Sequence, residues 1–285
     1  MAGKNREQIG TIESTDGIKL FFRDHPAENQ TARLVLVHGL GEHSGRYDHV
    51  IRLLNNKGIS VLAYDHRGHG KSEGKRGHID RFDEYINDLS MMIDKASDGI
   101  PPEMKLFLLG HSMGGLIVLN YVEKYPDRVD AVIASSPGLA PADKIPVIKG
   151  SLGKLMSSIW PSLSFDNELD PDNLSHDRDV VAAYVKDPLV HRRITARWFT
   201  EYLKAMEETV NSGERIRIPL LLQVAGADRI VDPITSKNFF NTIGSSDKTL
   251  HFYDGLYHEI YNEKDSNRKR VLADLETWIE EHTGV

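Results

Sequence analysis

The sequence predicts an α/β protein with a mostly parallel central sheet and helices on both faces of that sheet. Three observations lead to this prediction. Short apolar segments rich in β-branched residues alternate with longer amphipathic segments. Their strand–helix–strand order is typical of parallel strands joined by crossover helices. The chain has 285 residues, of which 40% are hydrophobic and 27% charged, which suffices for one large covered core.

The expected strands are recognised by short runs of apolar residues. An early run at 18–22 is followed by four nearly continuous apolar runs, the pattern of strands that are buried on both faces. Two further runs follow late in the chain. In order, the expected strands are 18–22, 33–37, 59–64, 105–109, 129–134, 219–225 and 249–253.

The expected helices lie between these strands. Their apolar residues recur every three or four positions, which places them on one face of a helix. The third helical segment stops at Pro126, because proline cannot continue a helix. In order, these helices are 46–56, 82–97, 113–125 and 267–281.

The alternation stops between about Gly138 and Gly213. This stretch contains several prolines and no clear strand, but it has helical patterns at 180–185 and 197–209. We therefore expect a core domain formed by residues 1–137 and 214–285, and a helical lid, or cap, inserted at 138–213. The composition is otherwise uniform, without repeats or a flexible linker.

Composition and charge exclude several classes of protein. The net charge of −7, from 35 basic and 42 acidic residues, argues against a nucleic-acid surface. The chain has no cysteine, which excludes disulfides, a thiol nucleophile and cysteine-ligated zinc. The polar residues 1–8 and the lack of an apolar run of about 20 residues favour a cytoplasmic protein without a signal peptide or membrane span.

The strongest chemical motif is GHSMGG, from Gly110 to Gly115. It matches G-x-S-x-G and stands between an expected strand and an expected helix. In that setting a sharp turn exposes the Ser112 hydroxyl, and the flanking glycines remove side chains that would collide with the turn. The alternative is a glycine-rich turn that only connects the strand to the helix. The context favours a nucleophilic serine.

A nucleophilic serine requires a base and an acid that orients the base, and in this arrangement they follow the serine in the order acid, histidine. His258 follows the last expected strand and is the candidate base, whereas His251 lies inside that strand. Asp228 and Asp232 both follow strand 219–225. Because Asp232 precedes Pro233, helix capping explains it, which leaves Asp228 as the catalytic acid.

An oxyanion hole would complete this site. It requires the backbone N–H of Met113 and a second N–H from the loop that follows strand 33–37. That loop reads HGLG at 38–41, and Leu40 is the expected donor because Gly39 lets the chain turn into the site. The alternative is an ordinary strand–helix loop.

Three other motifs suggest cofactors but lack the necessary spacing. Gly70-Lys71-Ser72 resembles the end of a phosphate-binding loop, but Asp65 stands where that motif needs its first glycine. The glycines at 39, 41 and 45 are spaced one residue too widely for a dinucleotide loop. The thirteen histidines show no metal-ligand spacing. We therefore expect no cofactor and no metal.

Several segments together resemble one branch of a known family. They read HGLGEHSGRY at 38–47, DHRGHGKSEG at 65–74, DPL at 187–189, ADR at 227–229 and YH at 257–258, together with the Ser112 turn. Nearly the whole chain resembles the monoacylglycerol lipase and lysophospholipase-like branch of the α/β-hydrolase family. The resemblance implies an α/β-hydrolase fold, a lid over an apolar acyl tunnel and a polar pocket for the alcohol. It also places Glu42 and Arg46 near the alcohol; the alternative is that both are solvated loop charges.

These observations predict a serine carboxylic-ester hydrolase, a monoacylglycerol lipase acting on lipid-like monoesters through an acyl-enzyme. A lysophospholipase and a general short-chain carboxylesterase are the alternatives among enzymes, and a non-catalytic binding module is the alternative of another class. The expected partners are the ester and water.

The insertion carries an apolar helix face that allows two interpretations. The helix packs on the main domain, or its apolar face lines an acyl tunnel and makes transient contact with a membrane surface. The apolar residues at helical spacing are Ile145, Ile148, Leu152, Leu155, Met156 and Ile159.

Overall fold

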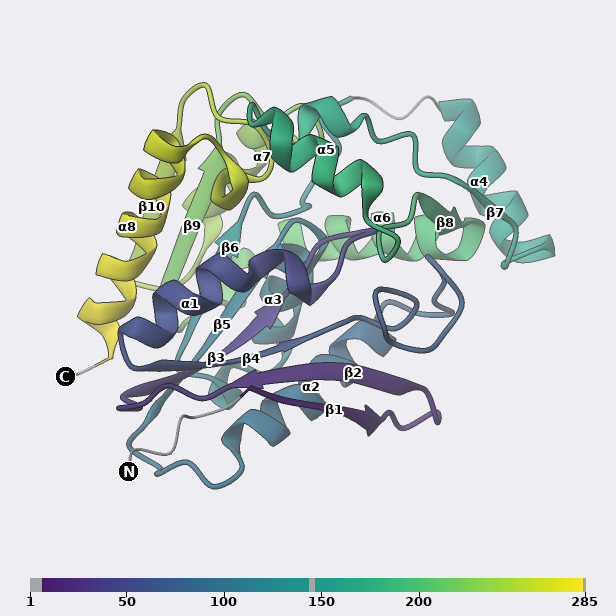
Figure 1. Ribbon diagram of the computed structural model, residues 1–285. Helices are drawn as coiled ribbons and strands as arrows, with labels where there is room; N and C mark the ends of the chain where they lie inside the picture. Colours follow the sequence, from purple (N-terminus) through teal and green to yellow (C-terminus); the bar gives the residue numbers. More distant parts are fainter. Residues whose placement is uncertain (1–6, 144–146, 284–285) are drawn as a thin grey trace.

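A computed structural model of the chain describes residues 7–143 and 147–283. Its centre is an eight-stranded sheet, counted over these residues, with helices on both faces (Figure 1). The strand order is β1-β2-β4-β3-β5-β6-β9-β10. Strands β2 and β4 pair antiparallel, as do β1 and β2, and the strands from β4 to β10 pair parallel. The predicted mostly parallel α/β sheet is therefore confirmed.

Apart from β1, the strands of this sheet begin and end close to the expected positions. Strands β3, β4, β5, β6 and β9 are buried almost throughout, because helices cover both of their faces. The bounds are β1 Gln8–Glu13, β2 Lys19–His25, β3 Ala32–Val37, β4 Ile59–Tyr64, β5 Lys105–His111, β6 Ala131–Ser135, β9 Leu220–Ala225 and β10 Lys248–Tyr253.

Two hydrophobic layers hold the helices against the sheet. One layer joins α1 and α8 to one face of the sheet, and the other joins α2, α3 and α7 to the opposite face. The two sets lie on opposite sides of the strands in Figure 1. The bounds are α1 Asp48–Asn56, α2 Asp83–Ser97, α3 Met113–Lys124, α7 Pro233–Thr242 and α8 Asp265–His282.

The first strand, β1, was not expected from the sequence. Its residues QIGTIE are mostly exposed or half-buried, so they lack the apolar run of a central strand. The strand forms because it pairs with β2 at the edge of the sheet. Gly10 lies opposite Phe22, whose ring occupies the space that a side chain at position 10 would need.

The segment at 138–213 contains helices, as expected, but it also contains a small sheet. Strands β7 (Ser164–Asp166) and β8 (Arg193–Thr195) pair antiparallel, so the expectation of no strand in this segment is wrong. Each strand has three residues, too few to show a period of two. The helices are α4 Val147–Ile159, α5 Arg178–Lys186 and α6 Ala196–Val210.

Helix α4 packs against α6 of the same insertion, away from the sheet (Figure 1). The Ser157 and Thr200 hydroxyls are 2.8 Å apart, and Arg197 donates to the Ser157 carbonyl at 2.9 Å. Leu155 and Ile159 are 52% and 69% exposed. Ile145 lies outside the described residues, and the side chains of Ile148 and Leu152 are not described.

No helix within 7–143 or 147–283 is long and apolar enough to cross a membrane.

Candidate active site

The turn between β5 and α3 has the strained geometry that exposes a serine hydroxyl. Ser112 has φ 54° and ψ −117°, a left-handed region that side-chain-bearing residues rarely occupy. The flanking glycines are required by close backbone contacts. A Cβ at Gly110 would lie 2.2 Å from the Gly114 carbonyl, and one at Gly114 would lie 2.1 Å from the Val37 carbonyl. The G-x-S-x-G spacing thus follows from packing at the end of the sheet.

The structure brings Ser112, His258 and Asp228 together. The Nε2 atom of His258 lies 2.8 Å from the Ser112 Oγ, and its Nδ1 lies 2.6 Å from the Asp228 Oδ2. The other Asp228 oxygen accepts the backbone N–H groups of Ile230 and Val231 at 2.8 and 3.1 Å. Asp228 and His258 are buried. A hydroxyl, an imidazole and a carboxylate are therefore joined in one hydrogen-bonded line.

The two alternative residues lie in other surroundings. Asp232 caps helix α7: its carboxylate accepts the N–H groups of Ile234 and Thr235 at 3.0 and 3.1 Å. His251 lies within β10, 4.0 Å from Asp274. Helix capping therefore accounts for Asp232, as the sequence suggested, and Asp228 is the carboxylate that contacts His258.

Electrostatics distinguish the two histidines beside Ser112. Burial disfavours the charged form of His258, but the charge of Asp228 and its hydrogen bond outweigh burial and raise the pKa of His258 above its ordinary value. His111 is also buried, and burial lowers its pKa to about 4. His111 is therefore neutral at pH 7, whereas His258 readily accepts a proton.

Two backbone N–H groups are free near the serine hydroxyl. Within the described part of the chain, the N–H groups of Leu40 and Met113 donate no hydrogen bond. The loop approaches Ser112 closely, because a Cβ at Gly39 would lie 3.2 Å from the Ser112 Cβ. Gly39 is thus needed for this close contact, whereas the positive φ that turns the loop, 75°, belongs to Gly41. Both donors expected for an oxyanion hole remain available.

Glu42 and Arg46 are buried in an ion-pair network, so the interpretation of solvated loop charges is wrong. Arg46 donates hydrogen bonds to Glu42 at 2.6 Å and to both carboxylate oxygens of Glu259 at 2.6 and 2.7 Å. These three side chains are at most 10% exposed. Glu259 was not predicted from the sequence, although its position directly after His258 and before the apolar Ile260 is a signal of burial.

The cavity beside Ser112 is small. Its volume is about 20 Å³, close to the space of a single water molecule. Part of its wall comes from the insertion and part from the core. The lining residues are Gly39, Leu40, Glu42, His111, Ser112, Leu169, Leu174, Tyr184, Ile230, His258 and Glu259.

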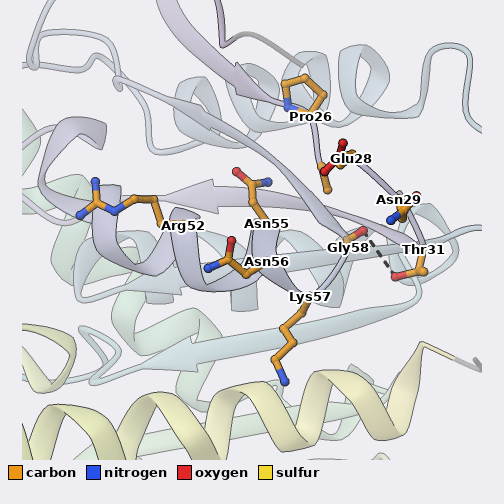
Figure 2. A pocket seen from close by; sticks show the side chains of 10 residues that line it. Pro26, Glu28, Asn29, Thr31, Arg52, Asn55, Asn56, Lys57 and Gly58 are labelled. Atoms are coloured by element: carbon orange, nitrogen blue, oxygen red, sulfur yellow. Dashed lines mark hydrogen bonds between the residues drawn. The ribbon is translucent and has the colours of Figure 1, made fainter. Parts of the chain in front are cut away.

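A much larger hollow, of about 800 Å³, lies away from this site (Figure 2). It is an open surface hollow between the 26–31 loop and the end of α1, and Gly58 in its wall precedes the first residue of β4. Ser112 follows the last residue of β5, so the two lie at opposite ends of the parallel strands. The hollow contains none of the residues that contact Ser112.

The described residues contain no group of three or more histidine or acidic side chains that could hold a metal ion. His38, His66 and His69 instead form a buried cluster with ring centroids 4.3 to 5.9 Å apart. Burial lowers the pKa of each of them, so the cluster is neutral at pH 7 and packs as part of the core.

A mostly parallel sheet, with a serine on the strained turn between a central strand and its helix, defines the α/β-hydrolase class. The chain belongs to the Hydrolase_4 family (serine aminopeptidase, S33), whose model matches residues 28–265. This membership, together with the relatives described next, makes the protein a hydrolase of the lipase and esterase type.

Two curated relatives and one solved structure illustrate this membership. The chain is 35% identical to a monoacylglycerol lipase of Mycolicibacterium smegmatis, over 87% of this chain and 88% of that protein. It is 36% identical to phospholipase YtpA of Bacillus subtilis, over 83% and 91%. The crystal structure of Paleococcus ferrophilus monoacylglycerol lipase matches with a TM-score of 0.85 and 40% identity, over 92% and 99%.

One relative is much longer. The chain is 36% identical to an uncharacterised abhydrolase domain-containing protein of Dictyostelium discoideum, over 90% of this chain but only 27% of that protein.

Proposed function

We propose that the protein is a serine hydrolase that cleaves monoacylglycerol-like esters through an acyl-enzyme. The observation that carries this proposal is the hydrogen-bonded line from the Ser112 Oγ through His258 to Asp228. His258 takes the serine proton while Oγ forms a bond to the ester carbonyl carbon. The Leu40 and Met113 N–H groups stabilise the oxyanion that results.

The tetrahedral intermediate then collapses. The bond from carbon to the alcohol oxygen breaks, and His258 gives its proton to the leaving alkoxide. A water molecule repeats the steps on the acyl-enzyme: His258 removes its proton, the carboxylic acid leaves, and the proton returns to Ser112. Asp228 holds His258 in the tautomer that has its proton on Nδ1 and stabilises the imidazolium in each half-reaction.

A fatty acyl ester is larger than the cavity beside Ser112. Sites for ligands of this kind occupy about 300 Å³ or more, whereas the cavity measures about 20 Å³. Binding such an ester therefore requires side chains of the insertion, such as Leu169, Leu174 and Tyr184, to move. We propose that the insertion acts as a lid through this motion.

The charge of the cavity favours substrates whose leaving group is a neutral alcohol over substrates whose leaving group carries a phosphate. Glu42 and Glu259 share the single guanidinium of Arg46, which leaves an excess negative charge beside Ser112. A phosphate on the leaving group would be repelled by this charge. Similarity to a phospholipase keeps lysophospholipase activity as the second candidate.

A substrate panel tests this choice. We expect kcat/KM for a monoacylglycerol to exceed that for a lysophosphatidic acid of the same acyl chain by at least about tenfold, since about 1.4 kcal/mol of repulsion suffices for that ratio. A short-chain p-nitrophenyl ester serves as the control for intact chemistry. An equal or higher kcat/KM for the phosphorylated ester would make lysophospholipase the better description.

The pH dependence of kcat/KM should report the protonation of His258. The base must be neutral to accept the serine proton, so activity falls as the pH drops through its pKa. Because the pKa of His258 is raised, the acid limb should have its midpoint above about 6.5, the ordinary value for histidine. The measurement is kcat/KM from about pH 5 to 9, with circular dichroism at each pH. A profile that stays flat down to about pH 5 in folded protein would exclude a histidine base.

A further inference from the structure

The network that buries Glu42 reaches the loop carrying one of the proposed oxyanion donors. The Glu42 Oε1 accepts the backbone N–H of Gly39 and the Tyr47 hydroxyl, both at 2.6 Å. Its Oε2 accepts from Arg46, also at 2.6 Å. One buried carboxylate therefore receives three donors, and one of them is the amide immediately before Leu40.

The same network is anchored beside the proposed base. Arg46 binds both oxygens of Glu259, the residue that directly follows His258. Asn262 donates at 3.0 Å to the Glu259 Oε2, the oxygen that also accepts from Arg46. Burial opposes ionisation of Glu259, but Arg46 outweighs it and lowers the pKa of Glu259 below its ordinary value. Glu259 thus stays charged, and the network links the His258 loop to the Gly39–Leu40 loop.

The loop is anchored at its two ends, where the His66 ring contacts the His38 carbonyl at 3.0 Å and the His191 N–H donates to the Gly41 carbonyl at 2.9 Å. Between these ends, the Gly39 carbonyl accepts a hydrogen bond from the Nδ1 of His38 at 2.8 Å, and the Leu40 N–H donates to no acceptor in the described part of the chain. Space is also limited: a Cβ at Gly39 would lie 2.8 Å from the Glu42 Oε1. The Glu42 carboxylate thus lies directly against the part of the loop that approaches Ser112.

We infer that Glu42 is a positioning residue, which holds the Gly39 N–H so that the Leu40 N–H points at the oxyanion, while Arg46 and Glu259 hold Glu42 in place. This inference rests on the proposed function, because it assigns a role in ester hydrolysis. It differs from the role that the family resemblance suggested for Glu42 and Arg46, which was contact with the alcohol.

Glu42→Gln is the decisive variant. A glutamine has one acceptor oxygen where three donors converge, so in either orientation its NH₂ group faces the N–H of Gly39 or of Arg46. The loop should shift, and a displacement of about 1 Å at a catalytic group costs about 10² in rate. We expect kcat for an oxygen ester to fall by about 10²-fold with little change in KM.

A thionoester separates positioning from a general loss of structure. Its carbonyl sulfur accepts hydrogen bonds poorly, so its hydrolysis depends less on the oxyanion donors. The ratio of kcat/KM for the ester to that for the thionoester should therefore fall by about tenfold or more in Glu42→Gln. The measurement is made at about pH 8, above the acid limb.

Asp88→Asn is the matched control. Asp88 is a buried carboxylate that binds a guanidinium, that of Arg67, through both oxygens at 2.6 and 2.7 Å, away from Ser112. Its replacement should lower stability but leave the ester-to-thionoester ratio unchanged. The same fall of the ratio in Asp88→Asn, or an unchanged ratio in Glu42→Gln, would overturn the inference.

Glu259→Gln serves if Glu42→Gln does not fold. It keeps Glu42 but weakens the hydrogen bonds that hold Arg46. The ratio of kcat/KM for the ester to that for the thionoester should therefore also fall, by a smaller factor. An unchanged ratio in folded Glu259→Gln would then overturn the inference. If the folded wild-type protein neither hydrolyses the ester nor reacts with a fluorophosphonate, the proposed function itself fails and the positioning role falls with it.

Discussion

Replacing Ser112 with alanine is expected to lower kcat for a p-nitrophenyl ester by about 10⁶-fold, the effect of losing the nucleophile in a serine protease. The substitution removes the Oγ atom that lies 2.8 Å from His258. The N–H groups of Leu40 and Met113 remain, so a small rate above that in water should persist. Because Ser112 has φ 54°, alanine keeps the same strain and the fold should survive. The measurement is steady-state kinetics, with circular dichroism as the check on folding.

A fluorophosphonate probe gives an independent readout of the same variant. It should label the wild-type protein at Ser112 and leave Ser112→Ala unlabelled. Ser236→Ala is a matched control, because Ser236 is buried and its hydroxyl has no hydrogen-bond partner in the described part of the chain. That variant should be labelled like the wild type. Folded wild-type protein that neither reacts with the probe nor turns over the ester would instead be a binding module on this fold.

Much of this site was predictable because its chemistry is local in sequence. The Ser112 turn depends on glycines two residues away on either side. A Cβ would lie 2.2 Å from a backbone oxygen at Gly110 and 2.1 Å from one at Gly114, so no other residue type fits there without rearrangement. The distinction between Asp228 and Asp232 was local too, because a proline directly after an aspartate indicates a helix cap. The central strands were equally clear from their unbroken apolar runs.

The parts that could not be predicted depend on contacts between distant segments. Glu42, Arg46 and Glu259 all resemble surface charges when each is considered alone, and their burial follows only from their pairing across 213 residues of sequence. Strand β1 is stabilised by its antiparallel neighbour more than by its own residues. The β7–β8 pair has three residues in each strand, so its pairing is fixed by the folded insertion rather than by any periodicity.

The small size of the cavity could not be predicted from sequence either, because it depends on where the insertion lies over the core. Leu174 and Tyr184 contribute to the cavity wall, and the Leu174 carbonyl accepts the N–H of Glu259 at 2.8 Å. The Arg46 guanidinium lies 4.8 Å from the centre of the Tyr184 ring. The insertion therefore contacts the same network that positions Glu42, and displacing it to admit a fatty acyl ester would change the surroundings of that network.

Asp228→Asn and Asp232→Asn should have opposite consequences for catalysis, although both remove one carboxylate charge. In Asp228→Asn, the amide oxygen should stay on the Ile230 and Val231 N–H groups, which turns the NH₂ group toward the Nδ1 of His258. Nδ1 then becomes an acceptor and the ring proton moves to Nε2, which can no longer take the proton of Ser112. The comparable substitution in a serine protease lowers kcat by about 10⁴, and a loss of that size is expected here.

In Asp232→Asn, the helix cap is retained, because asparagine caps a helix about as well as aspartate. The variant should keep the wild-type kcat within about twofold and lose less than about 1 kcal/mol of stability, since only the bonds to the first turn of α7 change. The two variants serve as each other's control in steady-state kinetics and thermal unfolding. If Asp232→Asn loses activity and Asp228→Asn retains it, the acid of the proposed triad is Asp232, and the 2.6 Å contact between Asp228 and His258 has no catalytic role.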